Sequence, residues 1–284
     1  MKAHKEGCLN NNSETELGHA SGVGEWARKS VNIQDGCLHD CKYCYAKAMA
    51  IRFGRATASG WKKGKVRAKA LNQQFYMKDV SPLSGNDIMF PTSHDIQPDN
   101  LAECTMILKR MLEAGNKVLI VTKPWLDCIK SLCRDLEDYK GQITFRFTIG
   151  SADDKMLNYW ETGASSFKER LAALQHAHKK GFKTSVSCEP MLDTKIDRVV
   201  EKVRPFVTDS IWLGRANRLI ATLSLNCSND QEAILKGREL MAQQSDAYIA
   251  SLYERFKDDP LIRFKDSIKK VVGVERPLQK GLDI

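Results

Sequence analysis

The sequence has no long hydrophobic run, little glycine and proline, and fewer acidic than basic side chains. No apolar stretch among its 284 residues approaches the roughly 20 that cross a bilayer, so we expect no membrane association. Its 18 glycines and 8 prolines are too few for a collagen-like or low-complexity chain. The polar segment Met1–Asn12 has no apolar stretch after its lysines, so we expect no secretory signal and a cytoplasmic location.

The charge balance is basic, with 44 lysines and arginines against 35 acidic residues and a net charge of +9. A positive excess attracts polyanions, but an ordinary basic surface explains it equally well. Many of these charges fall in a basic insert at residues 55–80, where Trp61 is a candidate for stacking on a base. The alternative is a solvated loop.

The nine cysteines are an odd number in a chain that is not small. Because no signal places the chain in an oxidising compartment, a disulfide framework is a poor interpretation. Ligation of a metal ion or an iron–sulfur cluster is the better one.

Short apolar runs alternate with helical patterns from about Val31 to Gly214. Six runs are expected strands, at 30–33, 88–90, 117–122, 142–149, 183–188 and 210–213. This β-α-β-α order predicts an α/β fold, a partial (β/α)6 TIM-type barrel with a parallel sheet. We expect residues 1–30 to form an N-terminal arm, 31–225 the core domain and 226–284 a C-terminal helical extension. In such folds, chemistry sits at the carboxyl ends of the strands.

The strongest motif is Gly36-Cys37-Leu38-His39-Asp40-Cys41-Lys42-Tyr43-Cys44-Tyr45, with the spacing C-x3-C-x2-C. We expect three thiolates within eight residues to bind the same metal ion or cluster. A structural zinc site normally has four protein ligands, and the nearest further donors, His39 and Cys8, have no obvious paired spacing. A [4Fe–4S] cluster held by three thiolates keeps one iron open for a substrate or cofactor.

This cysteine motif, directly after a strand and with an aromatic residue before its last cysteine, resembles the radical S-adenosylmethionine (SAM) superfamily. The resemblance implies a [4Fe–4S] cluster on Cys37, Cys41 and Cys44, with SAM as the second cofactor. It also implies reductive cleavage of SAM to a 5′-deoxyadenosyl radical that abstracts hydrogen from a substrate. A one-electron reductant such as flavodoxin or ferredoxin would be the partner.

Short segments at successive strand ends resemble the spore photoproduct lyase group of that superfamily. The matched segments are Pro91-Thr92-Ser93-His94-Asp95, Val121-Thr122-Lys123, Arg146-Phe147-Thr148-Ile149-Gly150-Ser151 and Ser187-Cys188-Glu189-Pro190-Met191. The match implies that Ser93 and Ser151 contact SAM and that Lys123 reaches its carboxylate. It also implies an adenosine contact near Glu189 and an adenine near Tyr43. The residue chemistry agrees, because lysine pairs with carboxylates and serine hydroxyls bond to carboxylate or ribose oxygens.

One departure concerns the hydrogen-donating cysteine of the lyases, which lies two residues before the serine matched to Ser93. Here that position is Pro91, so the reversal of thymine dimers is not carried over. Cys188 is a candidate substitute thiol, and a small buried core residue is the competing interpretation. His94 is a candidate for handling a substrate proton or for holding a loop.

The sequence therefore predicts a radical SAM enzyme, and the substrate we expect first is a nucleic-acid base or nucleotide. The alternatives are modification of a peptide or small metabolite, and a non-catalytic zinc or iron–sulfur module that binds nucleic acid.

Overall fold

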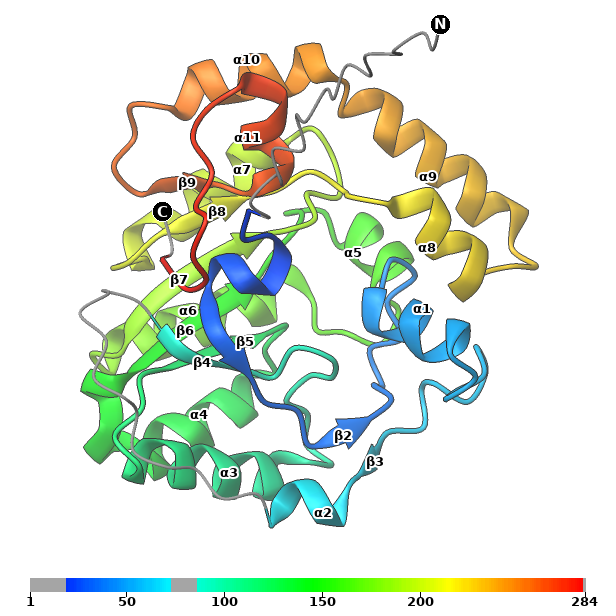
Figure 1. Ribbon diagram of the computed structural model, residues 1–284. Coiled ribbons are helices and arrows are strands. Elements are labelled where there is room, and N and C mark those ends of the chain that lie inside the picture. Colours follow the sequence, from blue (N-terminus) through cyan, green and yellow to red (C-terminus); the bar gives the residue numbers. More distant parts are fainter. Residues whose placement is uncertain (1–18, 73–85, 283–284) are drawn as a thin grey trace, which may run out of the picture.

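The computed structural model describes residues 19–72 and 86–282 and shows one curled parallel sheet wrapped by helices (Figure 1). Of the expected arm and basic insert, residues 1–18 and 73–80 lie outside the described ranges. The sheet has seven strands, in the order β1 (Ala27–Ser30), β4 (Asn86–Phe90), β5 (Val118–Thr122), β6 (Ile143–Thr148), β7 (Lys183–Cys188), β8 (Ile211–Leu213) and β9 (Ile262–Phe264). A separate antiparallel pair joins β2 (Gln34–Asp35) to β3 (Lys65–Val66).

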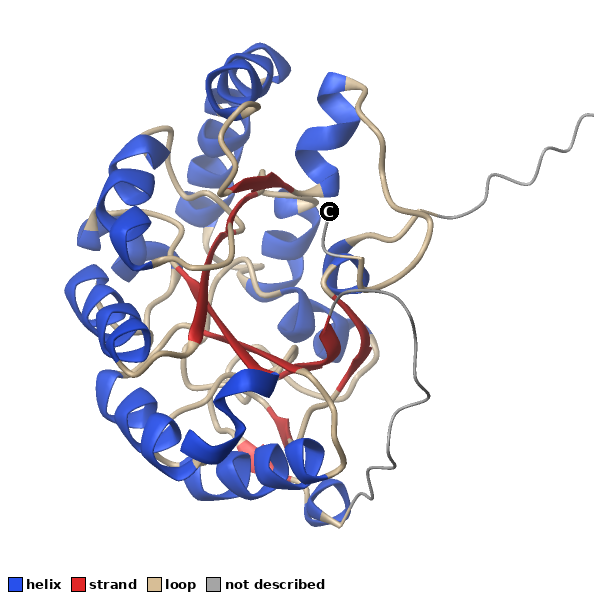
Figure 2. Cartoon of the chain, turned by 90° about the vertical axis from the view of Figure 1, so that its left-hand side faces the viewer, coloured by secondary structure: helices blue, strands red, loops and turns tan. Residues whose placement is uncertain are grey.

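The helices form an outer layer on the convex side of the sheet, as the side view shows (Figure 2). The α-helices are α1 (Tyr45–Arg52), α2 (Ala68–Leu71), α3 (Leu101–Glu113), α4 (Leu126–Asp135), α5 (Asp154–Trp160), α6 (Phe167–Lys179), α7 (Ile196–Val203), α8 (Leu219–Asn226), α9 (Gln231–Gln243), α10 (Asp246–Phe256) and α11 (Asp266–Val272). Three 3-10 turns are η1 (Gly22–Glu25), η2 (Glu137–Gln142) and η3 (Arg204–Phe206).

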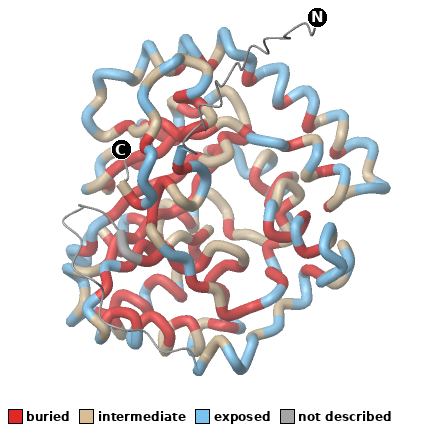
Figure 3. The backbone as a smooth tube through the Cα atoms, viewed as in Figure 1, coloured by how far each residue is buried: buried red, intermediate tan, exposed pale blue. Residues whose placement is uncertain are grey.

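Alternate residues of each strand enter two different environments, as the period of two in a strand requires. On β6, Phe145 and Phe147 pack into the main hydrophobic core. On the other face, Met89, Leu119 and Trp212 form a smaller cluster inside the curl of the sheet. The central strands β5, β6, β7 and β8 are accordingly almost wholly buried, and exposed residues gather on the outer helices and turns (Figure 3).

The prediction of a partial TIM-type barrel is confirmed, with two differences of detail. The first strand is Ala27–Ser30 rather than 30–33, because pairing with β4 ends at Ser30. Val31 and Ile33, whose apolar side chains suggested a strand, are buried in the segment that follows it. The seventh strand, β9, was not predicted, because three residues are too short a run to stand out from a loop. The sheet thus extends beyond the expected core range at both ends.

The open side of the curl is covered by segments from both ends of the described chain. The amide of Ala20 donates to the Pro277 carbonyl at 2.8 Å, and that of Gly281 donates to the Gly24 carbonyl at 2.9 Å. The buried Lys265 Nζ lies 2.9 Å from Glu25 Oε1 and 3.4 Å from Glu189 Oε2. One ammonium therefore links the segments before β1, after β7 and after β9.

Among the helices within the described ranges, none is both long and apolar enough to cross a bilayer.

Candidate active site

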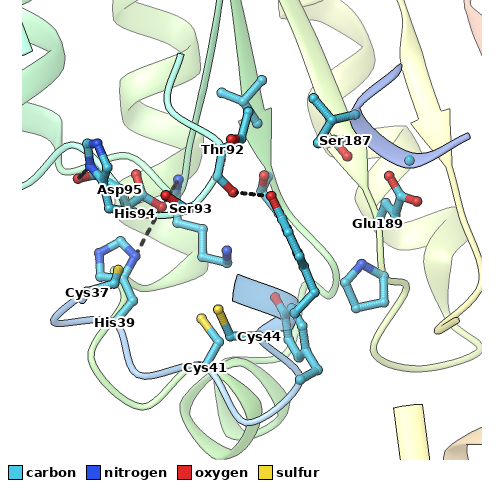
Figure 4. Close-up of a pocket in the computed structure, with 18 of the residues that line it drawn as sticks. Cys37, His39, Cys41, Cys44, Thr92, Ser93, His94, Asp95, Ser187 and Glu189 are labelled. Atoms are coloured by element: carbon cyan, nitrogen blue, oxygen red, sulfur yellow. Dashed lines mark hydrogen bonds and ion pairs between the residues drawn. The ribbon is translucent and has the colours of Figure 1, made fainter. Parts of the chain in front are cut away.

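A cavity of about 280 Å³ opens at the carboxyl ends of the strands. Its lining combines the cysteine loop, the loops after β4, β5 and β7, and residues from inside the curl (Figure 4). The predicted site residues that line it are Cys37, Cys41, Tyr43, Cys44, Ser93, His94, Lys123 and Glu189. Residues more than 150 positions apart in the sequence are thus brought to one site.

The three cysteines belong to one tight loop that leads into α1. Its entry uses Gly36 at φ +80°, where a Cβ atom would lie 2.5 Å from the Trp61 carbonyl oxygen. Asp40 also has a positive φ, +42°, a conformation that aspartate tolerates better than most residues. Cys44 is the N-cap of α1, and its Sγ accepts the Lys47 amide proton at 3.4 Å. The loop therefore places its last thiol at the positive end of a helix dipole.

The backbone of this loop is held from three sides. The Cys37 amide donates to the Trp61 carbonyl at 2.9 Å, and the Lys42 amide donates to the Trp160 carbonyl at 2.9 Å. The Asn226 side-chain amide on α8 donates to the carbonyls of Lys42 and Cys44, each at 2.9 Å. The loop is thus positioned by hydrogen bonds to the rest of the fold.

A buried carboxylate, Asp95, contacts the cysteine loop through His39. It accepts hydrogen bonds from the amides of Ile96 at 2.8 Å and Lys123 at 3.1 Å, and from the Thr122 hydroxyl. His39 Nδ1, inside the cysteine motif, lies 3.1 Å from Asp95 Oδ2. Burial alone would raise the pKa of Asp95, but His39, Lys123 and Thr122 outweigh it and lower this pKa to about 2. Asp95 is therefore a carboxylate that joins the cysteine loop to the end of β5.

His39 is oriented by a second contact, since its Nε2 accepts the indole proton of Trp125 at 3.1 Å. This bond leaves the imidazole proton on Nδ1, facing Asp95. Because both ring nitrogens are used inside the fold, His39 positions the loop.

Tyr43 is fixed by a buried ion pair. Its hydroxyl donates to Glu161, and the other oxygen of Glu161 lies 2.6 Å from Arg170, with both charged side chains fully buried. Burial raises the pKa of Glu161, but Arg170 and Lys123 outweigh it and hold this pKa below its ordinary value. Lys123 Nζ lies 5.8 Å from the centre of the Tyr43 ring.

Burial also raises the pKa of each motif thiol, that of Cys41 to about 12. Metal ligation requires thiolates, so binding of a cluster at this loop must release protons. Within the described residues, no group of three histidine, cysteine, aspartate or glutamate side chains is arranged to hold a single metal ion.

Ser93 and His94 lie in the turn after β4, which Asn32 holds in place. Oδ1 of the Asn32 side chain accepts the amide protons of Thr92 and Ser93, both at 2.7 Å. His94 Nε2 accepts the Ile33 amide proton, and its Nδ1 donates to the Asp95 carbonyl, each at 3.1 Å. Both of its nitrogens therefore serve backbone groups of the loop.

The opposite side of the cavity carries Glu189, with Ser187 beside it (Figure 4). Burial and the neighbouring Glu25 raise the pKa of Glu189, while Lys265 opposes this shift. Thr148, on the neighbouring strand β6, also lines the cavity. These groups face the cysteine loop across the space between them.

The structure does not bring Ser151 or Cys188 to the cavity. The Ser151 hydroxyl donates to Asp193 at 2.5 Å and is fully buried. Cys188 follows Ser187 on β7, so it points to the other face and packs in the main core. Trp61, suggested above for base stacking, lines the cavity but is buried, at 4% exposure, against α1.

Replacing Cys188 by alanine should leave any turnover at the cavity unchanged and lower the stability by about 1 kcal/mol, because only a buried sulfur is lost. Product analysis by chromatography and a thermal melt measure the two effects. Ser187→Ala, one residue away on the cavity face, is the matched control and should alter the turnover. A changed product from the Cys188 variant would assign its thiol a chemical role.

Several supporting residues were not predicted from the sequence. Asn32, Glu161 and Arg170 belong to no recognisable motif, and only the fold brings them to the site. The sequence around them gives no shared signal, because only Asn32 stands between apolar residues, while Arg170 directly follows Lys168 and Glu169.

Residues 31–203 match the family model of the Radical SAM superfamily. This match covers more than half of the chain, which therefore belongs to the radical SAM superfamily. The family implies SAM and an iron–sulfur cluster as cofactors, and it confirms the class of enzyme predicted from the cysteine motif.

Two curated relatives are uncharacterized proteins. ORF301 of Acidianus two-tailed virus is 27% identical over 184 residues, which are 60% of this chain and 58% of the viral protein. MJ0683 of Methanocaldococcus jannaschii is 23% identical over 190 residues, 63% of this chain and 67% of the relative. The chain thus matches less than two thirds of the length of the viral relative.

Two similar solved structures agree on the fold. Spore photoproduct lyase complexed with dinucleoside spore photoproduct has a TM-score of 0.52 and 17% identity, covering 88% of this chain and 79% of that one. Streptococcus suis SuiB bound to S-adenosylmethionine has a TM-score of 0.51 and 12% identity, covering 92% of this chain and 55% of that one. At these identities the likeness concerns the fold alone.

Proposed function

We propose that this protein is a radical SAM enzyme that cleaves SAM reductively at a [4Fe–4S] cluster held by Cys37, Cys41 and Cys44. The observation that carries the proposal is that three thiols of one loop line the same cavity as Lys123 and Glu189. When bound, the cluster supplies the electron that cleaves SAM to the 5′-deoxyadenosyl radical.

The residues present fit such a cluster. The three thiols belong to one loop, which spans eight residues, and all of them line the same cavity. Three donors from one loop leave a fourth position open, which is where a cofactor with an amine and a carboxylate can bind.

The surrounding side chains can hold such a ligand. Lys123 offers an ammonium at the end of β5, and no ion pair within 4 Å engages it among the described residues, so it is placed to bind a carboxylate. Ser93 offers a hydroxyl from the next loop, and the ring of Tyr43 lies beside Lys123. Glu189, across the cavity, suits the hydroxyl groups of a ribose. Ser151, bonded to Asp193, would act by holding the end of β6.

Lys123→Met should weaken SAM binding about ten- to a hundredfold, since a hydrogen bond to a charged group contributes about 1.5–3 kcal/mol. Calorimetric titration of SAM into the reconstituted protein measures this loss. Lys130→Met, on the exposed face of α4, is the control and should bind SAM normally. Equal affinity in both variants would remove Lys123 from the site.

For the substrate we propose a nucleic-acid base or nucleotide. The support is the likeness in fold to a lyase that holds a dinucleoside, together with Thr148 and Ser187 in the cavity lining, whose hydroxyls bond to no other described residue. Such hydroxyls can bond to the carbonyl and N–H groups of a base.

The test is anaerobic reconstitution with iron and sulfide, followed by reduction with dithionite in the presence of SAM. A brown protein that forms 5′-deoxyadenosine supports the enzyme, and a colourless protein with one zinc supports a binding module. Deuterated nucleosides and nucleotides are then supplied, and deuterium is sought in the 5′-deoxyadenosine. Transfer from a peptide but from no nucleotide would overturn the substrate proposal.

A further inference from the structure

The outer face of α1 is apolar and exposed although the helix begins at a cluster ligand. Seven large hydrophobic side chains in the described residues are exposed, and four of them lie between positions 38 and 53. Tyr45, Met49 and Phe53, exposed by 53%, 42% and 60%, are spaced four apart and so share one face of α1. Clustered exposed apolar residues of this kind mark interaction surfaces.

This face is surrounded by unbalanced positive charge. Residues 41–72 contain nine lysines and arginines and no acidic residue. The charge of this segment, +9, is therefore as large as the net charge of the whole chain. Lys42, Lys47 and Arg67 pair with aspartates elsewhere. Among the described residues, no ion pair engages the other six, which are Arg52, Arg55, Lys62, Lys63, Lys65 and Lys69.

Packing holds these charges beside the cysteine loop. The indole of Trp61 packs against Ala46 and Ala50 of α1, and the Trp61 carbonyl accepts the Cys37 amide proton. Lys62 and Lys63 follow directly and are exposed. Arg52 and Arg55 lie 6.0 and 5.6 Å from the centre of the Phe53 ring. The result is an apolar stripe with a basic rim.

We propose that this surface, Met49 and Phe53 with Arg52, Arg55, Lys62 and Lys63, docks an acidic protein that carries one electron to the cluster. The inference rests on the proposed function, which requires an external reductant. Methionine, aromatic residues and arginine are the types enriched at protein interfaces, and the basic rim complements an acidic partner. Electron-transfer encounters use small interfaces of this kind.

The position suits electron transfer, whose rate falls steeply with distance. Cys44 is both the N-cap of α1 and the most accessible of the three motif cysteines. With a rise of about 1.5 Å per residue, the whole helix lies within about 12 Å of that cap along its axis. One electron leaves the docked carrier, which is oxidised, and enters the cluster bound by the cysteine loop, which is reduced.

A substrate explains the surface less well. Tyr45 lines the cavity and donates to the Thr92 carbonyl at 2.7 Å, but residues 46–60 contribute nothing to the cavity lining. A substrate must reach SAM inside the cavity, whereas a carrier needs only to approach the ligands from outside.

The experiment compares two reductants on the variant Met49→Glu/Phe53→Glu. With reduced flavodoxin, the KM for flavodoxin should rise at least tenfold, because two carboxylates repel an acidic partner and remove its apolar contact. With dithionite, formation of 5′-deoxyadenosine should stay within twofold of the unchanged protein. Leu235→Glu, on the exposed face of α9, is the matched control and should behave normally with both reductants.

Direct binding gives a second measurement that does not depend on turnover. Flavodoxin should bind the unchanged protein, more weakly as salt increases, and bind the double variant at least tenfold more weakly. Equal binding, or an equal loss of turnover with both reductants, would overturn the proposal. Loss of binding to a single-stranded oligonucleotide with unchanged flavodoxin kinetics would assign the surface to nucleic acid instead. If dithionite itself gives no 5′-deoxyadenosine, the proposed function fails separately while the binding result stands.

Discussion

Replacing Cys41 by alanine is expected to abolish both cluster assembly and cleavage of SAM while the fold is retained. Cys41 is the middle donor of the three, and two thiols on this loop would leave the cubane with two ligands from the protein. Its side chain packs at the cavity rather than in the main core, so the loss of one sulfur changes the stability little. Iron content, visible absorption and 5′-deoxyadenosine measure the loss, and circular dichroism checks the fold.

Cys227→Ala provides the matched control for this variant. Cys227 is a partly exposed thiol after α8 that does not line the cavity, so the variant should keep its cluster and its turnover. A Cys41 variant that still cleaves SAM would show that the ligands have been assigned wrongly.

Removing Glu161 should cause the largest loss of stability. Glu161→Ala leaves the guanidinium of Arg170 buried without its carboxylate, and breaking a buried pair in this way costs about 3–5 kcal/mol. The same change removes the acceptor of the Tyr43 hydroxyl, so the aromatic residue beside the cluster ligands loses its anchor. Chemical denaturation measures the free energy of unfolding.

The control for Glu161 is a carboxylate in an exposed pair. Glu232→Ala breaks a contact of 3.1 Å with Lys236 on α9 and should cost less than about 0.5 kcal/mol. Equal losses in the two variants would show that the buried pair has no special weight.

The pH dependence of the Glu161 pair has a definite sign. The fold lowers the pKa of Glu161, so its contribution is complete at neutral pH and is lost as the pH falls below the ordinary value of 4.5. The difference in stability between the unchanged protein and Glu161→Ala should therefore shrink in acid.

The sequence predicted the parts of the site that depend on local pattern. Cys37, Cys41 and Cys44 lie within eight residues, so their spacing alone predicts that they bind one metal centre. Lys123 directly follows a clearly apolar strand, and parallel strands carry such residues to one edge of the sheet. The alternation of β6 and the helical period of α3 likewise predicted the barrel.

The parts that were not predicted depend on packing between distant segments. The sequence around Asp95 does not predict its contact with His39, because 56 positions separate the two residues. Likewise, β9 is three residues long, and its place in the sheet comes from pairing with β8 rather than from its own pattern. Successive side chains of a strand point to opposite faces, so a shift of one residue would have turned Cys188 toward the cavity. In the structure Ser187 lines the cavity, and Cys188 therefore packs in the main core.

The bridge made by Lys265 has a consequence for the order of synthesis. Its partners Glu25 and Glu189 emerge from the ribosome long before it does, together with six of the seven strands. Until β9 and Lys265 have been synthesised, the carboxylates of Glu25 and Glu189 lack the ammonium group that lies between them in the folded protein. The sheet also lacks its last strand. The mouth of the cavity is therefore completed only after nearly all of the sheet has been made.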